Sequence, residues 1–293
     1  MLIYIFLMFH NIAFSGGGTH TMTFIGCIKY MEENNHLIDI RNIIGASGGS
    51  FFALLLMLGW TSERIRVYCE KELVKHLESN RFNILSVFNL PRIFGLNNGD
   101  FLIKIIEDVL ERSGVDPQIN FIDITKLFGK NIVIATTNIT SRKIEYLSVD
   151  TYPEMKISTA VRMSVSIPIL FSPVKYYDDL YVDSMIYNNF PINFFTQFNI
   201  DTLGININIV DEKKKPTNFF SYMSLIYNCL YDSVMKKNTE TIKNDMSSIC
   251  NIDINESKKK FDLYNMKFVL DDAFITEMSN IGYDSLRVFF QEA

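Results

Sequence analysis

The chain is poor in histidine, and its four histidines, His10, His20, His36 and His76, all lie in its first part. An α/β-hydrolase triad places its histidine late in the chain, after the serine and the acid, so the sequence excludes that arrangement. His76 belongs to a charged stretch with helical spacing, residues 70–78, and we interpret it as a solvated residue on a helix face. A serine nucleophile in this chain would therefore need another base.

Cysteine and basic charge are also limited. The four cysteines, Cys27, Cys69, Cys229 and Cys250, lack the close spacing of metal ligands, and free thiols in a reducing compartment are the simplest interpretation. No acidic cluster near the motifs described below resembles a calcium loop, and we expect neither a metal nor another cofactor. The net charge of −5 gives no bulk electrostatic reason to expect nucleic acid as a partner.

The apolar N-terminal run is too short for a membrane span. Residues 1–9 are almost wholly apolar, but the run has no positively charged start and precedes no small-residue cleavage site. We therefore expect an intracellular protein, cytoplasmic or peripheral at a membrane, that is not secreted. The run itself is predicted to pack against the sheet, with insertion into a membrane surface as the alternative.

No linker rich in Pro and Ser divides the 293 residues, 48% of which are hydrophobic. This composition is sufficient for one large α/β core. We predict a catalytic core at residues 10–200, a C-terminal part at 201–293 whose strand and helices complete the same domain, and an apolar extension at 1–9. The sequence gives no indication of oligomeric state.

A Gly-rich turn, Gly45-Ala46-Ser47-Gly48-Gly49, fits the pattern G-x-S-x-G. It lies between an apolar strand-like run at 38–44 and a helix-like run at 50–57. A serine on such a turn presents its hydroxyl at the carboxyl edge of a sheet, and Gly45 and Gly49 let the two backbones approach closely. Ser47 is a candidate nucleophile, although a capping serine gives the same pattern. Without a late histidine its base would be a carboxylate, which predicts a Ser/Asp dyad.

A second Gly-rich stretch, Ser15-Gly16-Gly17-Gly18-Thr19-His20-Thr21, lies between a short buried strand at 11–14 and an apolar helix at 22–31. Its free backbone N–H groups could form a cradle for a phosphate or for the oxyanion of acyl transfer, and a flexible turn is the alternative. The absence of a following Gly-Lys-Ser/Thr disfavours a phosphate-binding P-loop. Thr21 replaces the third glycine of the dinucleotide fingerprint.

The third stretch runs from Leu180 to Pro191 (LYVDSMIYNNFP) and follows residues 160–174 (AVRMSVSIPILFSPV). With it the chain resembles the patatin-like phospholipase family, where a Gly-rich oxyanion loop, a G-x-S-x-G elbow and an Asp-Gly-Gly/Ala motif followed by an Asn-Pro-rich stretch occur in this order. Residues 94–113, 131–137 and 275–290 also look like landmarks of that family. The resemblance implies a three-layer α/β/α fold with a central, mostly parallel sheet and a helical cap.

The resemblance also implies roles for individual residues. Ser47 would be the nucleophile, Asp183 its base, and the amides of Gly16, Gly17 and Gly18 the oxyanion hole. The implied activity is metal-independent hydrolysis of glycerolipid carboxylic esters, above all glycerophospholipids, through an acyl-enzyme. The partner would be a lipid substrate at a membrane or lipid surface. A transacylase is a close variant, because an alcohol can intercept the same acyl-enzyme.

Three departures from the family pattern motivate a different interpretation. Asp183 is followed by Ser184 and Met185 instead of Gly and Gly/Ala. If that backbone needs a positive φ or a close approach, Ser184 costs about 1 kcal/mol and could turn the Asp183 carboxylate away. His20 occupies the position of an Arg or Lys, and Thr21 that of a glycine. The alternative is a catalytically silent protein of this fold that binds lipid or a partner; a small-molecule esterase is a third hypothesis.

A dry apolar pocket would raise the basicity of Asp183. Phe51, Phe171 and Tyr176 are candidates to line it, with ordinary core packing as the alternative. The segment 60–99 is rich in helical signals and could cover the site as a lid. Lysine clusters at 213–215, 236–237 and 258–260 are predicted as solvated loops, with contact to anionic lipid as the alternative.

The remaining elements are predicted from periodicity and cap signals. Helices are expected at 61–77 and 100–113, and strands at 132–136 and 202–209. In the second helix Asp100 can be the N-cap, Ile103, Ile106 and Leu110 form an apolar stripe, and Ser113-Gly114 ends the helix.

Overall fold

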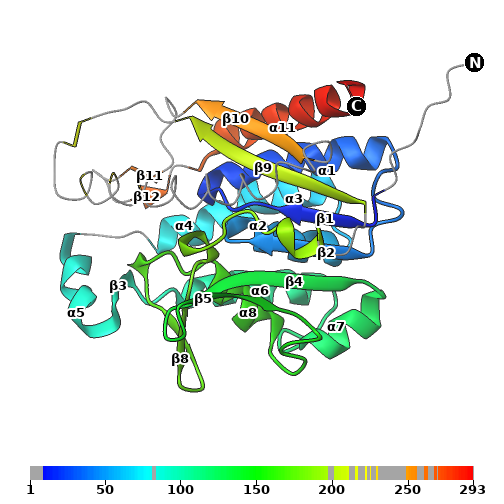
Figure 1. The fold of residues 1–293 in the computed structure, drawn as a ribbon. Coiled ribbons are helices and arrows are strands. Elements are labelled where there is room, and N and C mark those ends of the chain that lie inside the picture. The colour runs from blue at the N-terminus through cyan, green and yellow to red at the C-terminus, as the bar shows by residue number, and fades with distance from the viewer. Residues whose placement is uncertain are drawn as a thin grey trace, which may run out of the picture.

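The computed structural model describes residues 9–80, 84–196, 201–210, 215–216, 222, 225, 229, 249–255, 261–262, 267–268 and 270–292. Its centre is an eight-stranded sheet with the order β10-β9-β1-β2-β4-β8-β7, in which β5 also pairs with β4 (Figure 1). The strands are β1 (Asn11–Phe14), β2 (Asn42–Ala46), β4 (Asn131–Asn138), β5 (Lys143–Leu147), β7 (Val174–Tyr176), β8 (Asp179–Val182), β9 (Thr202–Val210) and β10 (Ile249–Asn255). The pairings from β10 to β4 are parallel, and β5 and β8 pair antiparallel with β4. The mostly parallel sheet is the one that the sequence predicts.

Helices surround this sheet. They are α1 (Thr23–Glu33), α2 (Gly48–Met57), α3 (Ser62–Tyr68), α4 (Val74–Ser79), α5 (Leu90–Ile93), α6 (Asp100–Arg112), α7 (Phe121–Phe128), α8 (Ile157–Ser164), α9 (Asn193–Thr196) and α11 (Asp272–Glu292). A separate parallel pair joins β3 (Gly95–Asn97) to β6 (Ile169–Phe171), and two short strands, β11 (Phe261–Asp262) and β12 (Lys267–Phe268), pair with each other.

The inner strands are buried on both faces, as parallel strands covered by helices must be. In β2, Ile43 faces the main core, and its neighbour Ile44 faces a second cluster with Phe190, Ile192 and Phe195. α2 packs against β1, β2 and β4, while α8 packs against β4 and α11 against α1 and β10. Residues 190–195 contribute to the cover of the other face. The alternation gives the three layers that the sequence predicts.

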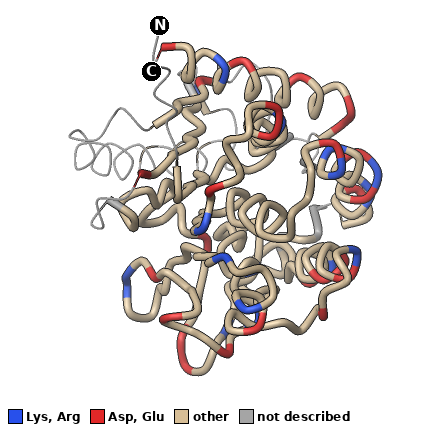
Figure 2. Tube along the Cα trace, turned by 90° about the vertical axis from the view of Figure 1, so that its right-hand side faces the viewer, with Lys and Arg blue, Asp and Glu red and all other residues tan. Residues whose placement is uncertain are grey.

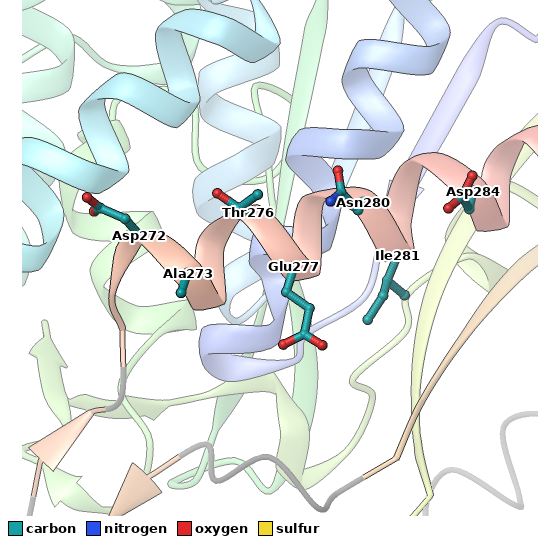
Figure 3. A pocket seen from close by; sticks show the side chains of 7 residues that line it. All are labelled: Asp272, Ala273, Thr276, Glu277, Asn280, Ile281 and Asp284. Carbon is teal, nitrogen blue, oxygen red and sulfur yellow. The ribbon is translucent and has the colours of Figure 1, made fainter.

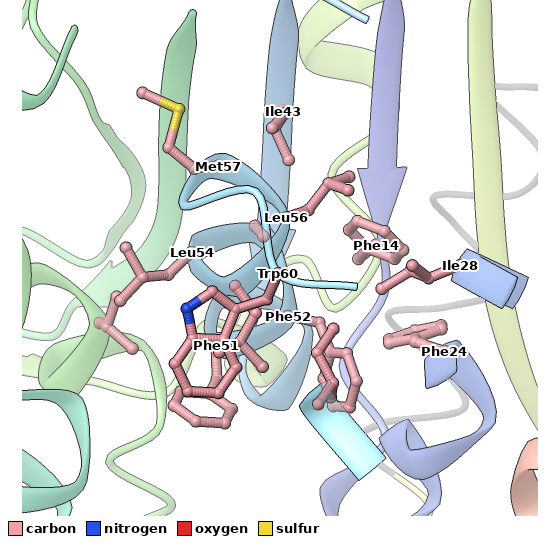
Figure 4. Close-up of a cluster of buried hydrophobic side chains, with 14 of the residues drawn as sticks. Phe14, Phe24, Ile28, Ile43, Phe51, Phe52, Leu54, Leu56, Met57 and Trp60 are labelled. Carbon is pink, nitrogen blue, oxygen red and sulfur yellow. The ribbon is translucent and has the colours of Figure 1, made fainter. Parts of the chain in front are cut away.

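The main core is centred on α2, which is apolar around its whole circumference and therefore lies inside the molecule. Figure 4 shows side chains from β1, α1 and α2 meeting there. The ring of Phe14 lies 4.9 Å from that of Phe24, and Phe24 meets Phe52 edge-on at 5.5 Å. This packing fixes the start of α2 relative to the ends of β1 and β2.

Several local predictions are corrected by the structure. β2 begins at Asn42, and Ile38 is exposed in the preceding turn. The helix predicted at 61–77 runs as α3, a π-helical turn (Cys69–Leu73) and α4. The N-cap of α6 is Gly99, not Asp100. The N-cap has a φ of 77°, a left-handed conformation that glycine adopts at little cost.

The apolar stripe of α6 also differs from the prediction. Its buried residues are Phe101, Ile105, Ile106, Val109 and Leu110, whereas Ile103 is only partly buried. Ser113 and Gly114, the latter with φ 71°, end the helix as predicted.

Some predictions fall outside the described residues. These are the N-terminal run at 1–8 and the lysine clusters, apart from Lys215. Phe9 is buried and packs edge-on against Phe290, with ring centroids 6.1 Å apart. All four cysteines are free thiols. Figure 2 shows Asp and Glu next to Lys and Arg along the outer helices, in agreement with ion pairs such as Arg66–Glu70 and Arg112–Asp108.

Candidate active site

Ser47 lies at the carboxyl end of β2, on the turn that leads into α2. Its φ of 51° and ψ of −131° are unusual for a residue with a side chain, and such strain is typical of functional sites. Both predicted elbow glycines are required by close backbone contacts. A Cβ on Gly45 would lie 2.4 Å from the carbonyl oxygen of Gly49, and a Cβ on Gly49 would lie 2.3 Å from that of Ser15.

The structure brings Ser47 and Asp183 together, although 136 positions separate them in the sequence. The Ser47 hydroxyl donates a hydrogen bond to Asp183 Oδ2 at 2.6 Å. Asp183 follows β8, is fully buried, and accepts the Met185 N–H at its Oδ1 at 2.9 Å. The two contacts fix the carboxylate with one oxygen directed at the hydroxyl.

Burial raises the basicity of Asp183. Desolvation raises the pKa of this carboxyl group from 3.8 to about 7, against the opposing effect of the hydrogen bonds from Ser47 and the Met185 amide. A general base is most effective when its pKa lies near the working pH, because it is then both ionised and basic. Asp183 can therefore accept a proton near neutral pH.

We expect the acylation rate to rise with pH until Asp183 is ionised, since only the carboxylate can take the Ser47 proton. The measurement is kcat/KM for a soluble ester between about pH 5 and 9, which reports the pKa of the free enzyme. The rate should rise about tenfold per pH unit on the acid side and level off above about 7, the pKa of Asp183. A rate that is independent of pH across this range would contradict the assignment of Asp183 as base.

Ser184 does not have the conformation that would make it costly. It begins a short 3-10 turn (Ser184–Ile186) and is absent from the residues with positive φ among those the structure describes. The serine therefore adds no left-handed strain, and the Asp183 carboxylate is directed at Ser47 instead of being turned away. The expected penalty at this position is corrected accordingly.

The Gly-rich loop packs directly against Ser47. A Cβ on Gly16 would lie 2.8 Å from the Cβ of Ser47, so only glycine allows this approach. The Gly16 N–H, however, donates to the carbonyl oxygen of Asn189 at 2.8 Å. Gly16 therefore departs from its predicted role as an oxyanion donor, and its amide instead ties the loop to the chain beyond Asp183. Gly17 and Gly18 are the remaining predicted donors.

The two departures in this loop have structural explanations. Thr21 donates its hydroxyl to the carbonyl oxygen of Gly18 at 2.7 Å, which stabilises the 3-10 turn at Gly18–Met22. His20 is buried with its ring 5.8 Å from that of Phe274, and it is not among the residues that line the cavity described below. Neither residue disturbs the contact between Ser47 and Asp183.

Sequence reasoning missed Gly48 as a possible oxyanion donor. Gly48 is the first residue of α2, so its N–H has no partner within the helix, and it lines the cavity together with Ser47 and Gly18. Its position just after the nucleophile is the signal that could have identified it, because the residue after the nucleophile supplies such a donor in other serine hydrolases.

The end of α8 supports both members of the dyad, which the sequence also did not predict. The hydroxyl of Ser164 accepts the Ser47 N–H at 2.9 Å, and the carbonyl oxygen of Ser166 accepts the Asp183 N–H at 3.0 Å. Arg162, one turn earlier, donates to the Ser166 hydroxyl. One short stretch of chain therefore sets the distance between Ser47 and Asp183.

An apolar cavity of about 130 Å³ opens beside Ser47. Phe51 and Phe171 line this cavity, as the sequence predicts. Leu73 and Leu77, from the segment 60–99, also line it. Tyr176 does not line this cavity. It lies on β7 and meets the ring of Tyr177 edge-on at 4.6 Å. The other apolar lining residues are Met22, Phe52, Leu102, Ile105, Ile106, Val161, Val165, Ile167 and Leu270.

A larger hollow of about 590 Å³ lies along α11, away from these groups (Figure 3). Thr276 and Asn280 lie on one side of the helix and Glu277 and Ile281 on the other, so the side chains do not converge on a common point. Within the described residues, no group of three His, Cys, Asp or Glu side chains is placed to hold a metal ion. No helix of the described part has the length and hydropathy to cross a membrane.

Comparisons with known proteins agree with this geometry. The family described as Patatin-like phospholipase matches residues 12–196. Uncharacterized protein R571 of Acanthamoeba polyphaga mimivirus is 32% identical over 227 residues, which cover 73% of this chain and 73% of the viral protein. Probable lipid hydrolase 463L of Invertebrate iridescent virus 6 is 27% identical over 193 residues, 63% of this chain and 62% of that protein.

A solved structure shows the same fold. The crystal structure of VipD from Legionella pneumophila matches with a TM-score of 0.58 at 15% identity, covering 97% of this chain and 67% of VipD. The match confirms the fold class predicted from the sequence.

Proposed function

This chain belongs to the patatin-like phospholipase family, and from that premise we propose that it hydrolyses carboxylic esters of glycerolipids through an acyl-enzyme on Ser47. The observation that carries the proposal is the 2.6 Å hydrogen bond from Ser47 to a buried Asp183 beside an apolar cavity. The similar viral protein named a probable lipid hydrolase supports the same substrate class.

In the proposed reaction Asp183 takes the hydroxyl proton while Ser47 Oγ attacks the ester carbonyl carbon. In this reaction the amides of Gly17, Gly18 and Gly48 would stabilise the tetrahedral oxyanion, a contribution of several kcal/mol in such sites. When the C–O bond of the ester breaks, Asp183 returns its proton to the departing alcohol. Asp183 then deprotonates a water molecule, which attacks the acyl-enzyme. As the bond between the acyl carbon and Ser47 Oγ breaks, Asp183 gives this proton to Ser47 Oγ, and the fatty acid is released.

The lining of the cavity favours an apolar substrate. Its polar surface is confined to the end formed by Ser47 and the Gly-rich loop, and the rest is aliphatic or aromatic. Each methylene group that moves from water to such a lining contributes about 0.8 kcal/mol to binding. An acyl chain therefore fits this cavity better than a small polar ester.

The features that motivate a silent binding protein do not disturb the dyad. Ser184 has no positive φ, and His20 and Thr21 lie outside the contact between nucleophile and base. These observations favour the hydrolase over the silent alternative.

Two measurements on the intact protein test the proposal. The first is release of fatty acid from mixed phospholipid vesicles in excess chelator, where we expect activity because the proposed chemistry uses no metal. The second is labelling by a fluorophosphonate, where we expect one modified residue, Ser47, identified by mass spectrometry of the labelled peptide.

The control is the heat-denatured protein, which should neither label nor hydrolyse. A folded protein that binds vesicles but shows no labelling and no fatty-acid release would support the silent alternative instead. Release that stops in chelator would contradict the metal-independent mechanism.

A further inference from the structure

Two segments next to the cavity expose large apolar side chains. Phe88 is 72% exposed, Phe94 is 66% exposed, and Ile169 is 42% exposed. Phe94 directly precedes Gly95, which pairs with Ile169 across β3 and β6, so the two side chains belong to neighbouring positions. We call Phe88, Arg92, Phe94 and Ile169 the apolar rim. Arg92 lies on α5, and Phe94 joins α5 to β3. In Figure 1, α5 projects from one end of the molecule.

Two exposed residues of the rim, Phe94 and Ile169, have a positive φ. Phe94 is the C-cap of α5 and has φ 57°, a left-handed conformation in which many helices end. Ile169 has φ 73°, which is a genuine outlier for a β-branched residue. Glycine or asparagine would relieve this strain, yet both positions hold large apolar side chains that face solvent. Such strain at exposed apolar residues is typical of a binding surface.

The charged side chains within the two stretches that carry the rim are basic. Residues 84–99 contain a single charged side chain, Arg92, and residues 163–177 contain a single one, Lys175. Both are basic and exposed, in a chain whose net charge is −5. Asp100 and Asp178 border these stretches. Within them, an apolar surface with two exposed basic side chains complements a layer of acyl chains under anionic headgroups.

The rim is continuous with the cavity. Ile167 and Phe171, two positions before and after Ile169, both line the cavity that holds Ser47. A lipid that meets Ile169 at the surface is therefore next to the apolar walls that lead to the nucleophile.

We propose that the apolar rim docks onto a phospholipid membrane that carries anionic headgroups, with Phe94 and Ile169 inserted among the lipids and Arg92 at the headgroups. The proposal rests on the proposed function, because it gives the orientation in which an acyl chain passes from the membrane to Ser47. It rests on residues other than the N-terminal run and the lysine clusters.

The test measures vesicle binding in the inactive Ser47→Ala protein, so that hydrolysis does not change the vesicles. The variant is Phe94→Asn with Ile169→Asn, since asparagine tolerates positive φ and preserves the local fold. We expect at least about tenfold weaker partitioning into vesicles of mixed phosphatidylcholine and phosphatidylserine, because two apolar side chains no longer insert. Arg92→Gln should weaken binding to these vesicles but leave binding to pure phosphatidylcholine vesicles unchanged.

The matched control is Ile38→Asn in the same background. Ile38 is 64% exposed. It precedes the amino end of β2, whereas Ser47 follows the carboxyl end of the same strand. Its substitution should not change partitioning. With Ser47 intact, the double variant should hydrolyse a soluble short-chain ester at the parental rate and vesicle lipid more slowly.

The outcomes separate the two proposals. If the double variant binds vesicles as well as its parent does, the docking proposal is wrong. It is also wrong if no form of the protein binds vesicles, and that result would point to a protein partner for this surface. If the rim variant loses binding while the intact protein hydrolyses no ester, the docking surface stands and the proposed activity fails.

Discussion

Replacing Asp183 by asparagine is expected to slow the acylation of Ser47 by about 10³- to 10⁴-fold, the range found when a catalytic base or its partner is removed. The amide has nearly the same volume, and its oxygen can still accept a hydrogen bond from either Ser47 or the Met185 N–H. It cannot take the hydroxyl proton, because an amide is not a base near neutral pH. The measurement is the rate of fluorophosphonate labelling at pH 8.

The stability of this variant provides the control. The pKa of Asp183 in the folded protein, about 7, lies above its ordinary value of 3.8, so the folded state holds the proton more tightly than the unfolded state does. Asp183 therefore contributes stability that is complete below about pH 4 and is lost as the pH rises through about 7. The asparagine variant has no such loss. The urea midpoint of the variant minus that of the parent should therefore be more positive at pH 8 than at pH 4. Slow labelling in a folded protein with this pattern supports Asp183 as base, whereas labelling at the parental rate would contradict it.

The elements that the sequence predicts well are those whose requirements are local. The Gly45-to-Gly49 turn needs small residues at fixed positions, because two backbones meet there whatever the rest of the chain does. Alternating or continuous apolar runs predict β1, β4 and β9, since burial of a strand depends mainly on its own side chains.

The predictions that failed depend on contacts between distant parts of the chain. The sequence predicts Gly16 as an oxyanion donor, but its N–H donates to the carbonyl oxygen of Asn189, which is far from Gly16 in the sequence. Ser184 suggested strain because its φ cannot be read from residue types. Tyr176 was close to Phe171 in sequence, but the β7–β8 pairing carries it away from the cavity.

Arg162 illustrates the same limit, because a buried charge is not visible in a sequence. Its side chain is 3% exposed and donates to the carbonyl oxygens of Asn98, Gly99 and Ser172 and to the Ser166 hydroxyl. Burial lowers the pKa of this guanidinium group to about 10, so it remains charged at neutral pH. The cation therefore joins the loop before α6, the end of α8 and the chain after β6 into one unit next to the dyad.

Replacing Arg162 by methionine is expected to lower the free energy of unfolding by several kcal/mol, since each buried acceptor left without a donor costs about 1–3 kcal/mol. Methionine fills most of the space, so the loss comes from the acceptors and not from a large cavity. Lysine should rescue little, because one ammonium group cannot replace a planar donor that reaches three segments. The measurement is urea unfolding, with Arg287→Met as the control. Arg287 is an exposed partner of Asp284, and its loss should change stability by less than about 0.5 kcal/mol.

Arg162→Met should also show whether the residue positions the dyad beyond supporting the fold. Because Ser166 holds the Asp183 amide and contacts Arg162, its displacement moves the base relative to Ser47. A shift of this kind lowers kcat for a soluble ester by about 100-fold, because a displacement near 1 Å is enough to lose that factor. KM should change little, since Arg162 does not line the cavity. If the folded Arg162→Met protein instead has the parental kcat at low temperature, Arg162 contributes only to stability. The proposed coupling from Arg162 through Ser166 to Asp183 would then be wrong.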